Sequence, residues 1–434
     1  SGSGGVVQLI SANDDVQVLA AGTTNRGDID NSAAGGNGGT INIVAGDDLT
    51  VDGAINNSST AGGGVVVLTG TDGSVVVSNN GNNTSFAINN STTGGNGGTI
   101  AVTSSGTGED ILIGGSILNR STGTGGFINL DSNGDDLTIQ KNISGTGWIS
   151  TNIDNSTTGG AGGTVTVESF DNITFRGDVI NTATATGGTV TIRSTDGLVS
   201  LQDLSAAAAD INNSTTGTTA GNVTVSAAGT GGSDNVYIEG TISNTSNGTA
   251  GNIILSSLNS SVTVDNVLAA SPAIDNSTTN GSGGIITITS GGATGSSRVD
   301  GTIDNRSTTT AGNVVMTSTN NDVIVGAASA AVRGDILNST TGGDGGTITL
   351  AAADDASVDG VVDNRSTGTG GNISITGADG SANVSNSANN LTFAIDNSTT
   401  GGTGGNITLS ASGAGENVTV AGSILNSSTG DAGN

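Results

Sequence analysis

The stretch IDNSTTGGAGGTVTV at residues 153–167 decides the fold, because versions of it recur fourteen times along the 434-residue chain. Each copy has an aliphatic residue, an Asn two places later, a small polar and glycine-rich turn, and a closing Gly. Aliphatic residues follow two and four places after that Gly, so the pattern mixes a turn with the start of a strand. The recurring asparagines are Asn31, Asn57, Asn90, Asn119, Asn155, Asn181, Asn213, Asn244, Asn276, Asn305, Asn338, Asn364, Asn397 and Asn426.

The length of the turn shows that the true repeat is a pair of modules. The closing Gly lies eight residues after Asn31 and seven residues after Asn57, and these two lengths alternate along the whole chain. The repeating unit is therefore two modules, about 61 residues long and present seven times, and a repeat of this size takes precedence over any estimate of domain number from length. The sequence predicts a single continuous β-solenoid over residues 1–434.

Short runs of alternating aliphatic residues predict three strands in each module. Residues two apart lie on the same face of a strand, so the aliphatic residues face inward and the Thr, Ser and Asn between them face water. In the first module the inward pairs are Val7 and Leu9, Val16 and Val18, and Ile29 and Asn31. We therefore expect an all-β fold, a parallel β-helix with three short strands per coil and about fourteen coils arranged as seven two-coil repeats.

Composition excludes several classes of function. The net charge of −28 disfavours binding to nucleic acid and to anionic membranes, and no apolar run approaches the length of a membrane span. The chain has no His and no Cys, which removes the usual general base and the commonest transition-metal ligands. We expect no catalytic residue, no required cofactor, no nucleic-acid partner and no membrane insertion.

The recurring Asn has two interpretations. Twelve of the fourteen lie in Asn-x-Ser/Thr, the acceptor pattern for N-glycosylation, with Asn31 and Asn181 as exceptions. However, an Asn on the same face as the preceding aliphatic residue is buried and cannot carry a glycan. The favoured interpretation is a structural ladder, in which each side-chain amide donates to the amide carbonyl of the Asn in the next coil and also holds the turn backbone.

The turn between the first and second strand is acidic in most modules. Stacked carboxylates repel one another unless solvent and salt screen them, or unless a divalent cation with a preference for oxygen ligands lies between coils. A purely local turn role is favoured, since Asp and Asn suit turns, and the Gly-Gly-x-Gly-x-Asp calcium-binding nonapeptide is not present. The candidate residues for weak calcium binding are Asp14, Asp15, Asp47, Asp48, Asp135, Asp136, Asp354 and Asp355.

The corner between the second and third strands alternates in length. Even modules have a Gly two places before the aliphatic residue, as at Gly301 and Gly360, which predicts a tight corner. Odd modules usually insert several residues there, and the insertions hold apolar side chains. Two interpretations remain open, a local flap over the corner or a lateral contact with a second solenoid or partner. The candidate lateral interface contains Phe86, Trp148, Leu204, Leu268 and Phe393.

The stretch GGTINIVAGDDLTVDG at residues 38–53 resembles the repeats of filamentous haemagglutinin-type adhesins, the large exoproteins of bacterial two-partner secretion. The resemblance extends over the whole chain. It implies a right-handed β-helix rod that is secreted and exposed at a bacterial surface or in a secreted matrix.

Four functions follow from these observations. The favoured one is a structural extracellular fibre or adhesin shaft. A calcium-dependent surface-layer or matrix protein is the alternative. An ice-binding solenoid is less favoured, because the Thr-rich strand at residues 164–166 is not matched at residues 65–67. A polysaccharide-active enzyme is also less favoured, because the basic residues are dispersed.

The register of the repeat carries a further expectation about partners. The span from Gly5 to Gly433 is seven complete double modules, and the first and last modules look like the middle ones. We therefore expect residues 1–434 to be a segment or a stacking subunit of a longer fibre, in which each end meets another coil, either in the same chain or head to tail in a second copy, with lateral association between copies as well.

Overall fold

The computed structural model describes residues 2–21, 26–79, 86–143, 147–149, 151–202, 208–230, 232, 234–266, 272–329, 332–386 and 393–431, with the backbone alone for 141–143 and 147–149. The chain divides into two compact units, unit 1 (Ser1–Thr215) and unit 2 (Thr216–Asn434). No helix occurs among these residues, and hence none that is long and apolar enough to cross a membrane.

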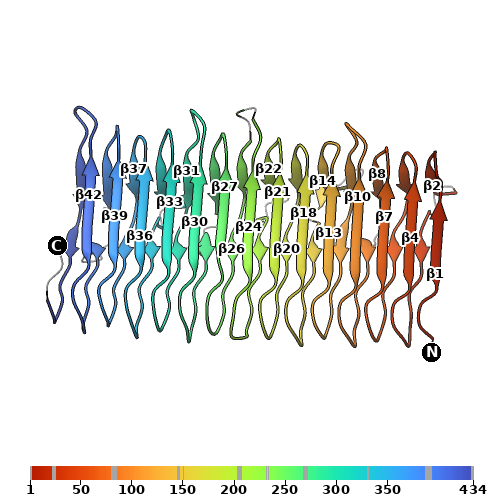
Figure 1. The fold of residues 1–434 in the computed structure, drawn as a ribbon, viewed down its shortest axis with the longest axis horizontal. Coiled ribbons are helices and arrows are strands. Elements are labelled where there is room, and N and C mark those ends of the chain that lie inside the picture. Colours follow the sequence, from red (N-terminus) through yellow and green to blue (C-terminus); the bar gives the residue numbers. More distant parts are fainter. Residues whose placement is uncertain are drawn as a thin grey trace. The chain divides into compact units, whose positions relative to one another are not determined.

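Unit 1 contains seven coils, and each coil contributes one strand to each of three parallel sheets (Figure 1). Its first sheet consists of β1 (Val6–Ile10), β4 (Thr40–Ala45), β7 (Val65–Gly70), β10 (Thr99–Ser104), β13 (Phe127–Ser132), β18 (Thr164–Ser169) and β21 (Thr189–Ser194). Its second sheet consists of β2 (Val16–Val18), β5 (Leu49–Val51), β8 (Val75–Ser78), β11 (Ile111–Gly114), β14 (Leu137–Ile139), β19 (Ile173–Phe175) and β22 (Val199–Leu201). Its third sheet consists of β3 (Ile29–Asp30), β6 (Ile55–Asn56), β9 (Phe86–Asn89), β12 (Ser116–Leu118), β17 (Ile153–Asp154), β20 (Val179–Ile180) and β23 (Ile211–Asn212).

Unit 2 repeats this arrangement with seven further coils. Its first sheet consists of β24 (Asn222–Ala227), β27 (Ile253–Ser257), β30 (Ile285–Ser290), β33 (Asn313–Ser318), β36 (Thr347–Ala352), β39 (Asn372–Gly377) and β42 (Asn406–Ala411). Its second sheet consists of β25 (Val236–Ile238), β28 (Val262–Asp265), β31 (Ser297–Asp300), β34 (Val323–Gly326), β37 (Ala356–Val358), β40 (Ala382–Ser385) and β43 (Val418–Ala421). Its third sheet consists of β26 (Ile242–Ser243), β29 (Ile274–Asp275), β32 (Ile303–Asp304), β35 (Ile336–Leu337), β38 (Val362–Asp363), β41 (Phe393–Asp396) and β44 (Ser423–Leu425).

The predicted parallel β-helix with three strands per coil is thus confirmed, and the pairing register explains its core. Successive strands pair in register, so that Ile41 lies beside Val66 and Ile43 beside Leu68. These four side chains are fully buried, and the residues between them are at least partly exposed. Each fully buried aliphatic side chain contributes about 1.5 to 3 kcal/mol, so the stacked columns stabilise coils that could not bury a core alone.

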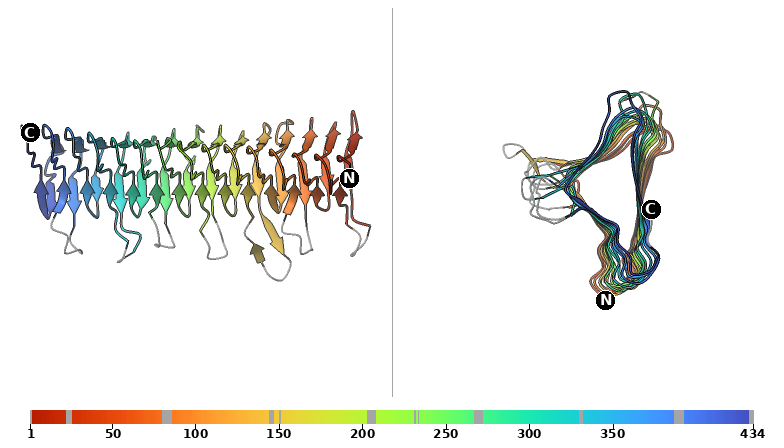
Figure 2. Two further views of the ribbon diagram at one scale, coloured as in Figure 1. Left: turned by 90° about the horizontal axis from the view of Figure 1, so that it is seen from below. Right: turned by 90° about the vertical axis from the view of Figure 1, so that its left-hand side faces the viewer.

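Three corners join the strands of each coil, and Figure 2 shows them in the end-on view. The acidic corner joins the first strand to the second, as at Asp47 and Asp48 between β4 and β5. The variable corner joins the second strand to the third. The glycine-rich corner leads from the third strand, through the recurring Asn, to the next coil.

The variable corner is tight in even modules for two different reasons. Gly301 has φ of 121°, a conformation that side chains with a Cβ rarely adopt. Gly360 does not have a positive φ, but a Cβ there would collide with the Asp335 carboxylate and with the backbone of Gly334. In one odd module of unit 1, the insertion forms an antiparallel hairpin of β15 (Lys141–Ile143) and β16 (Gly147–Ile149), which projects from the coils (Figure 2).

Candidate functional site

The recurring asparagines form one ladder in each unit. In unit 1 the side-chain Nδ2 of each Asn donates a hydrogen bond to Oδ1 of the Asn in the next coil, from Asn31 to Asn213, over N···O distances of 2.9 to 3.2 Å. Unit 2 has the same arrangement from Asn244 to Asn426, at 2.8 to 3.2 Å. All fourteen residues of the sequence pattern therefore take part in side-chain stacking.

The second N–H of each amide holds the glycine-rich corner. Asn57 donates to the carbonyl of Gly39 at 3.0 Å and Asn155 donates to that of Gly126 at 3.0 Å. Twelve of the fourteen asparagines are fully buried, from Asn57 to Asn213 in unit 1 and from Asn244 to Asn397 in unit 2. Since both N–H groups and the carbonyl are paired, the ladder satisfies a buried polar group without introducing charge.

The Asn-x-Ser/Thr pattern has a structural explanation at the same corner. In six coils the Ser or Thr two places after the Asn is buried, and its hydroxyl donates to a carbonyl three residues further on. Ser59 donates to Gly62 at 2.6 Å and Ser307 donates to Thr310 at 2.7 Å. The hydroxyls of Thr157 and Thr399 donate instead to a glycine carbonyl of the preceding coil, and those of Thr92 and Thr340 are buried without a hydrogen-bond partner. In the coils where both residues of the pattern are buried, the Asn is therefore not accessible for glycosylation in the folded chain.

The acidic corner contains two kinds of carboxylate. The second acidic residue of the pair accepts the backbone N–H of the equivalent position in the next coil: Asp110 accepts from Asp136 at 3.1 Å, and Asp136 accepts from Asn172 at 3.0 Å. In unit 2, Asp355 accepts from Ser381 in the same way at 2.7 Å. This bond is a local reason for an acidic or amide side chain at the corner.

Seven of the eight candidate calcium ligands lie in three groups whose carboxylate oxygens are within 4.8 Å of one another. Asp14 is exposed and lies outside these groups. Two further members of these groups, Asp171 and Asp322, were not predicted from the sequence, because neither is part of an Asp-Asp pair. The three groups are Asp15, Asp47 and Asp48; Asp135, Asp136 and Asp171; and Asp322, Asp354 and Asp355.

The stacked carboxylates disfavour their own ionisation. Desolvation raises the pKa of Asp171, and the charges of Asp136 and Asp135 raise it further. Desolvation also raises the pKa of Asp354, and the carboxylate of Asp355 adds to this effect. Negative charges are therefore crowded at the acidic corner. Such crowding is found at cation sites, and it is found equally on acidic surfaces whose carboxylates repel one another without a bound ion.

A buried serine column beside the acidic corner was not anticipated from the sequence. Ser104, at the end of β10, donates to the carbonyl of Gly73 at 3.0 Å, and Ser257 donates to that of Asp234 at 2.6 Å. Each bond ties the first sheet to the corner backbone of another coil. The signal was present, since Ser104 lies two places after the inward Val102 and so shares its face.

The third sheet holds acidic residues beside the ladder, and arginines neutralise them. In unit 2, Arg306 contacts Asp304 with its Nε at 2.9 Å from one carboxylate oxygen, and Arg365 contacts Asp363 at 2.9 and 2.8 Å. The carboxylates are almost fully buried. The short motif Asp-Asn-Arg, in which the middle residue belongs to the ladder, is the sequence signal for these pairs.

The structure describes only some of the residues of the candidate lateral interface. Phe86 and Phe393 are half-buried at the variable corner, where their carbonyls accept from the side chains of Asn79 and Asn386. Leu204, Leu268 and the side chain of Trp148 lie outside the described residues. A hollow of about 320 Å³ in unit 2 is lined by Arg306, Asp335, Leu337, Val361, Asp363, Arg365, Phe393 and Asp396.

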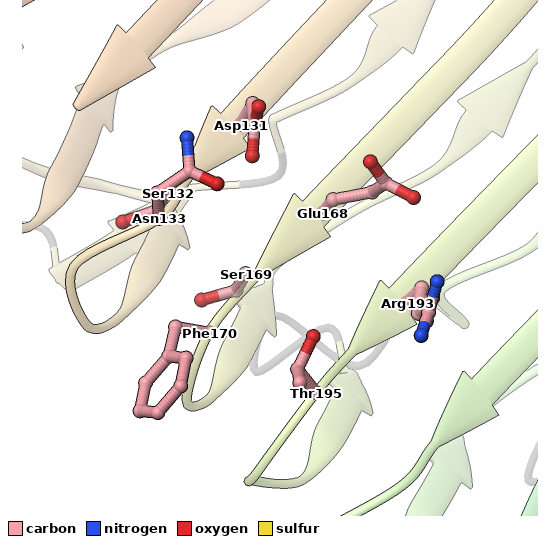
Figure 3. A pocket seen from close by; sticks show the side chains of 8 residues that line it. All are labelled: Asp131, Ser132, Asn133, Glu168, Ser169, Phe170, Arg193 and Thr195. Carbon is pink, nitrogen blue, oxygen red and sulfur yellow. The ribbon is translucent and has the colours of Figure 1, made fainter. Parts of the chain in front are cut away.

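A second hollow lies on the first sheet of unit 1, where Figure 3 shows charged side chains from three successive strands. It measures about 120 Å³. Asp131, Glu168 and Arg193 lie side by side in register on β13, β18 and β21, and Phe170 projects beside them with its side chain half exposed. These three charges interrupt an outer face that is otherwise uncharged.

Comparison with known proteins gave no match, whether with family models, with curated proteins or with solved structures.

Proposed function

We propose that this chain is a non-catalytic structural protein, the shaft of an extracellular fibre or adhesin built by stacking β-solenoid coils. The observation that carries the proposal is the pair of asparagine ladders. Twelve of the fourteen recurring asparagines are fully buried, and the side-chain amides of the ladder join one coil to the next. The recurring chemistry thus serves stacking rather than the recognition or conversion of a substrate.

The geometry of the described residues supports the non-catalytic part of the proposal. The three acidic groups contain carboxylates alone, and the chain has no His to act beside them as a general base. The described arginines of the third sheet are paired with carboxylates. The extracellular location rests on the resemblance to secreted β-helix repeats.

Lengthwise association with other copies is part of the proposed function. Each strand pairs with its neighbours through the same parallel hydrogen bonds in every coil, so a coil of a second copy can add to the stack in the same way. The variable corner, with Phe86 and Phe393, is a proposed site of lateral contact.

Electron microscopy of the purified chain tests this function. We expect elongated particles whose length increases with protein concentration, because lengthwise stacking follows mass action. The matched variant Asn155→Ala removes one rung of a ladder and should shorten the particles or expose them to protease. Compact particles of fixed size at all concentrations would contradict the proposal.

A calcium-dependent surface-layer or matrix protein is the second candidate, and the three carboxylate groups favour it. Hard divalent cations take several carboxylate oxygens as ligands, and such groups are stacked in both units. The test is thermal melting with calcium and with a chelator. We expect a shift of at most a few degrees, because the second acidic residue of each corner already has a backbone partner. A fall of tens of degrees on chelation, abolished in Asp135→Asn/Asp171→Asn, would favour the calcium-dependent function instead.

A further inference from the structure

The outer face of the first sheet in unit 2 carries no charged side chain. Its outward residues, on β24, β27, β30, β33, β36, β39 and β42, are Asn, Thr, Ser, Ala, Val and Ile, and none is charged. Figure 1 shows these strands side by side. In a chain with a net charge of −28, an uncharged sheet face of seven strands is a distinct surface.

The side chains on this face are short and stiff. Its central row runs across neighbouring strands through Ile254, Thr287, Val315 and Thr349, which are in register. β-branched residues have one strongly restricted side-chain torsion, so they lose little conformational freedom when a partner covers them. Ile254 and Ile285 are 39% and 42% exposed, which is high for isoleucine, and they lie on adjacent strands.

We propose that this face is a lateral contact surface for a second copy of the same chain, packed sheet against sheet. This inference deepens the proposed function, on which it rests, by naming a surface other than the variable corner through which shafts associate side by side. Two copies that carry the same large negative charge repel each other at their acidic corners and along their charged sheets. The uncharged face is where they can approach to the spacing of about 10 Å that packed sheets require.

The size of the face fits a weak but specific contact. Strands of six residues are about 20 Å long, and seven strands at about 4.8 Å cover about 34 Å. Two such faces bury about 1,300 Å² in total, at the low end of stable protein interfaces. The equivalent face of unit 1 is less suitable, because Asp131, Glu168 and Arg193 would have to lose water on contact.

The experiment adds charge to the face without changing its shape. The triple variant Asn252→Asp/Asn313→Asp/Asn372→Asp is isosteric, and each new carboxylate can still accept the backbone N–H that the Asn accepts, from Ile285, Thr347 and Asn406. The matched control, Asn280→Asp/Asn320→Asp/Asn383→Asp, adds the same charge outside the first sheet. Circular-dichroism melting of all three proteins verifies that both variants stay folded.

Sedimentation velocity over a range of concentration and salt gives the result. We expect the parent and the control to associate side by side, with a dissociation constant at least tenfold lower than that of the face variant. The difference should shrink at high salt, because salt screens the added charges. Equal lateral association of all three proteins would overturn the proposal. Association that is purely lengthwise and insensitive to both variants would also overturn it, but this result would leave the proposed shaft intact.

Two other occupants of a flat, Thr-rich face are separate outcomes of the same design. The assays are pull-down of the parent protein by microcrystalline cellulose or chitin, and thermal hysteresis in an ice-growth assay. A positive result that is lost in the face variant, in a parent that does not self-associate, would assign the face to a crystalline surface. It would overturn the contact between copies.

Discussion

The asparagine ladder and the acidic corner are built in the same way, yet they have opposite effects on stability. Parallel in-register pairing places identical side chains about 4.8 Å apart in successive coils. An amide carries both a donor and an acceptor, so Asn119 and Asn155 satisfy each other. An ionised carboxylate carries acceptors alone, so Asp136 and Asp171 repel each other. Stacking therefore amplifies whatever a side chain does next to a copy of itself.

Replacing an amide of the asparagine ladder by a carboxylate should have the largest effect on stability. Asn155→Asp places a carboxylate in the buried ladder, where it faces the Asn181 Oδ1 and the Gly126 carbonyl without a proton to donate. We expect a loss of about 3 to 5 kcal/mol in local stability, as for an uncompensated buried charge. Asn155→Ala should cost less, about 1 to 3 kcal/mol, since it leaves neighbouring polar groups unpaired but adds no charge.

Hydrogen exchange in β17, β18 and β20 measures this loss locally, which matters because a repeat protein need not unfold as one unit. Unchanged protection of these strands in Asn155→Ala would show that the ladder contributes little to stability. Thr166→Ala, on the outer face of β18 in the same module, is the control for the substitution itself.

The arginines of the third sheet should have the next largest effect, because they make stacked carboxylates tolerable. Arg365 contacts the almost fully buried Asp363 through two hydrogen bonds and lies 3.7 Å from Asp396. These two carboxylates in turn raise the pKa of Arg365. We expect Arg365→Ala to cost about 1 to 2 kcal/mol, reduced from the value for charged hydrogen bonds because the arginine is half exposed.

The matched control is Arg193→Ala, because no described residue lies within hydrogen-bond or ion-pair distance of the Arg193 guanidinium. Chemical denaturation of both variants should show a lower midpoint for Arg365→Ala alone. Equal midpoints would mean that solvent, rather than arginine, compensates the carboxylates of this sheet.

The pH dependence of stability should also distinguish the asparagine ladder, which does not titrate, from the stacked carboxylates. Desolvation raises the pKa of Asp171 and of Asp275 above the ordinary value of 3.8. Their contribution to stability is therefore fully present below pH 3.8 and is lost as the pH rises through the raised folded-state values. We expect the melting temperature to increase as the pH is lowered from 7 towards 4.

Asp30 has the opposite sign, since hydrogen bonds from Ser32 lower its pKa, and its contribution is lost below pH 3.8. Stability should consequently pass through a maximum near pH 4. The slope between pH 7 and 4 should be smaller in Asp171→Asn. A melting temperature that falls steadily on acidification from pH 7 would show that repulsion at the acidic corner is negligible.

Replacing a carboxylate of the acidic corner by an amide should have the smallest effect on stability. Asp136→Asn keeps an acceptor for the Asn172 N–H and removes one of the charges beside Asp135 and Asp171. The next coil already uses Asn172 in this way, where its side-chain oxygen accepts from Leu198 at 3.0 Å. We expect a gain of about 0.2 to 1 kcal/mol, the range for side-chain pairs between neighbouring strands. Thermal melting at low salt measures it, and a loss of stability would contradict the repulsion.

The sequence predicted the features that depend on spacing within one module. The pair Ile153 and Asn155 lies two residues apart, which places the amide inward without any knowledge of the neighbouring coils. The same spacing marks Val77 and Asn79, where the buried Asn79 supports the inserted segment, but this motif occurs in fewer modules and was not recognised.

Features that depend on the register between modules were predicted only in part. Asp171 joins Asp135 and Asp136 because the corner of one coil lies over that of the next, although Asp171 comes 36 positions after Asp135 in the sequence. A search for Asp-Asp pairs cannot find such a residue. Likewise, the sequence explained Gly360 by backbone conformation, whereas the approach of Asp335 decides it.

The direction of the strand-pairing hydrogen bonds has a mechanical consequence. These bonds run along the stack, while the chain runs across it, so a pull along the stack loads the bonds of one coil at a time. A coil that detaches releases the 26 to 36 residues between successive ladder asparagines, or about 90 to 125 Å of extended chain. The force at which the proposed shaft yields is therefore that of a single coil, and each coil absorbs work as it opens.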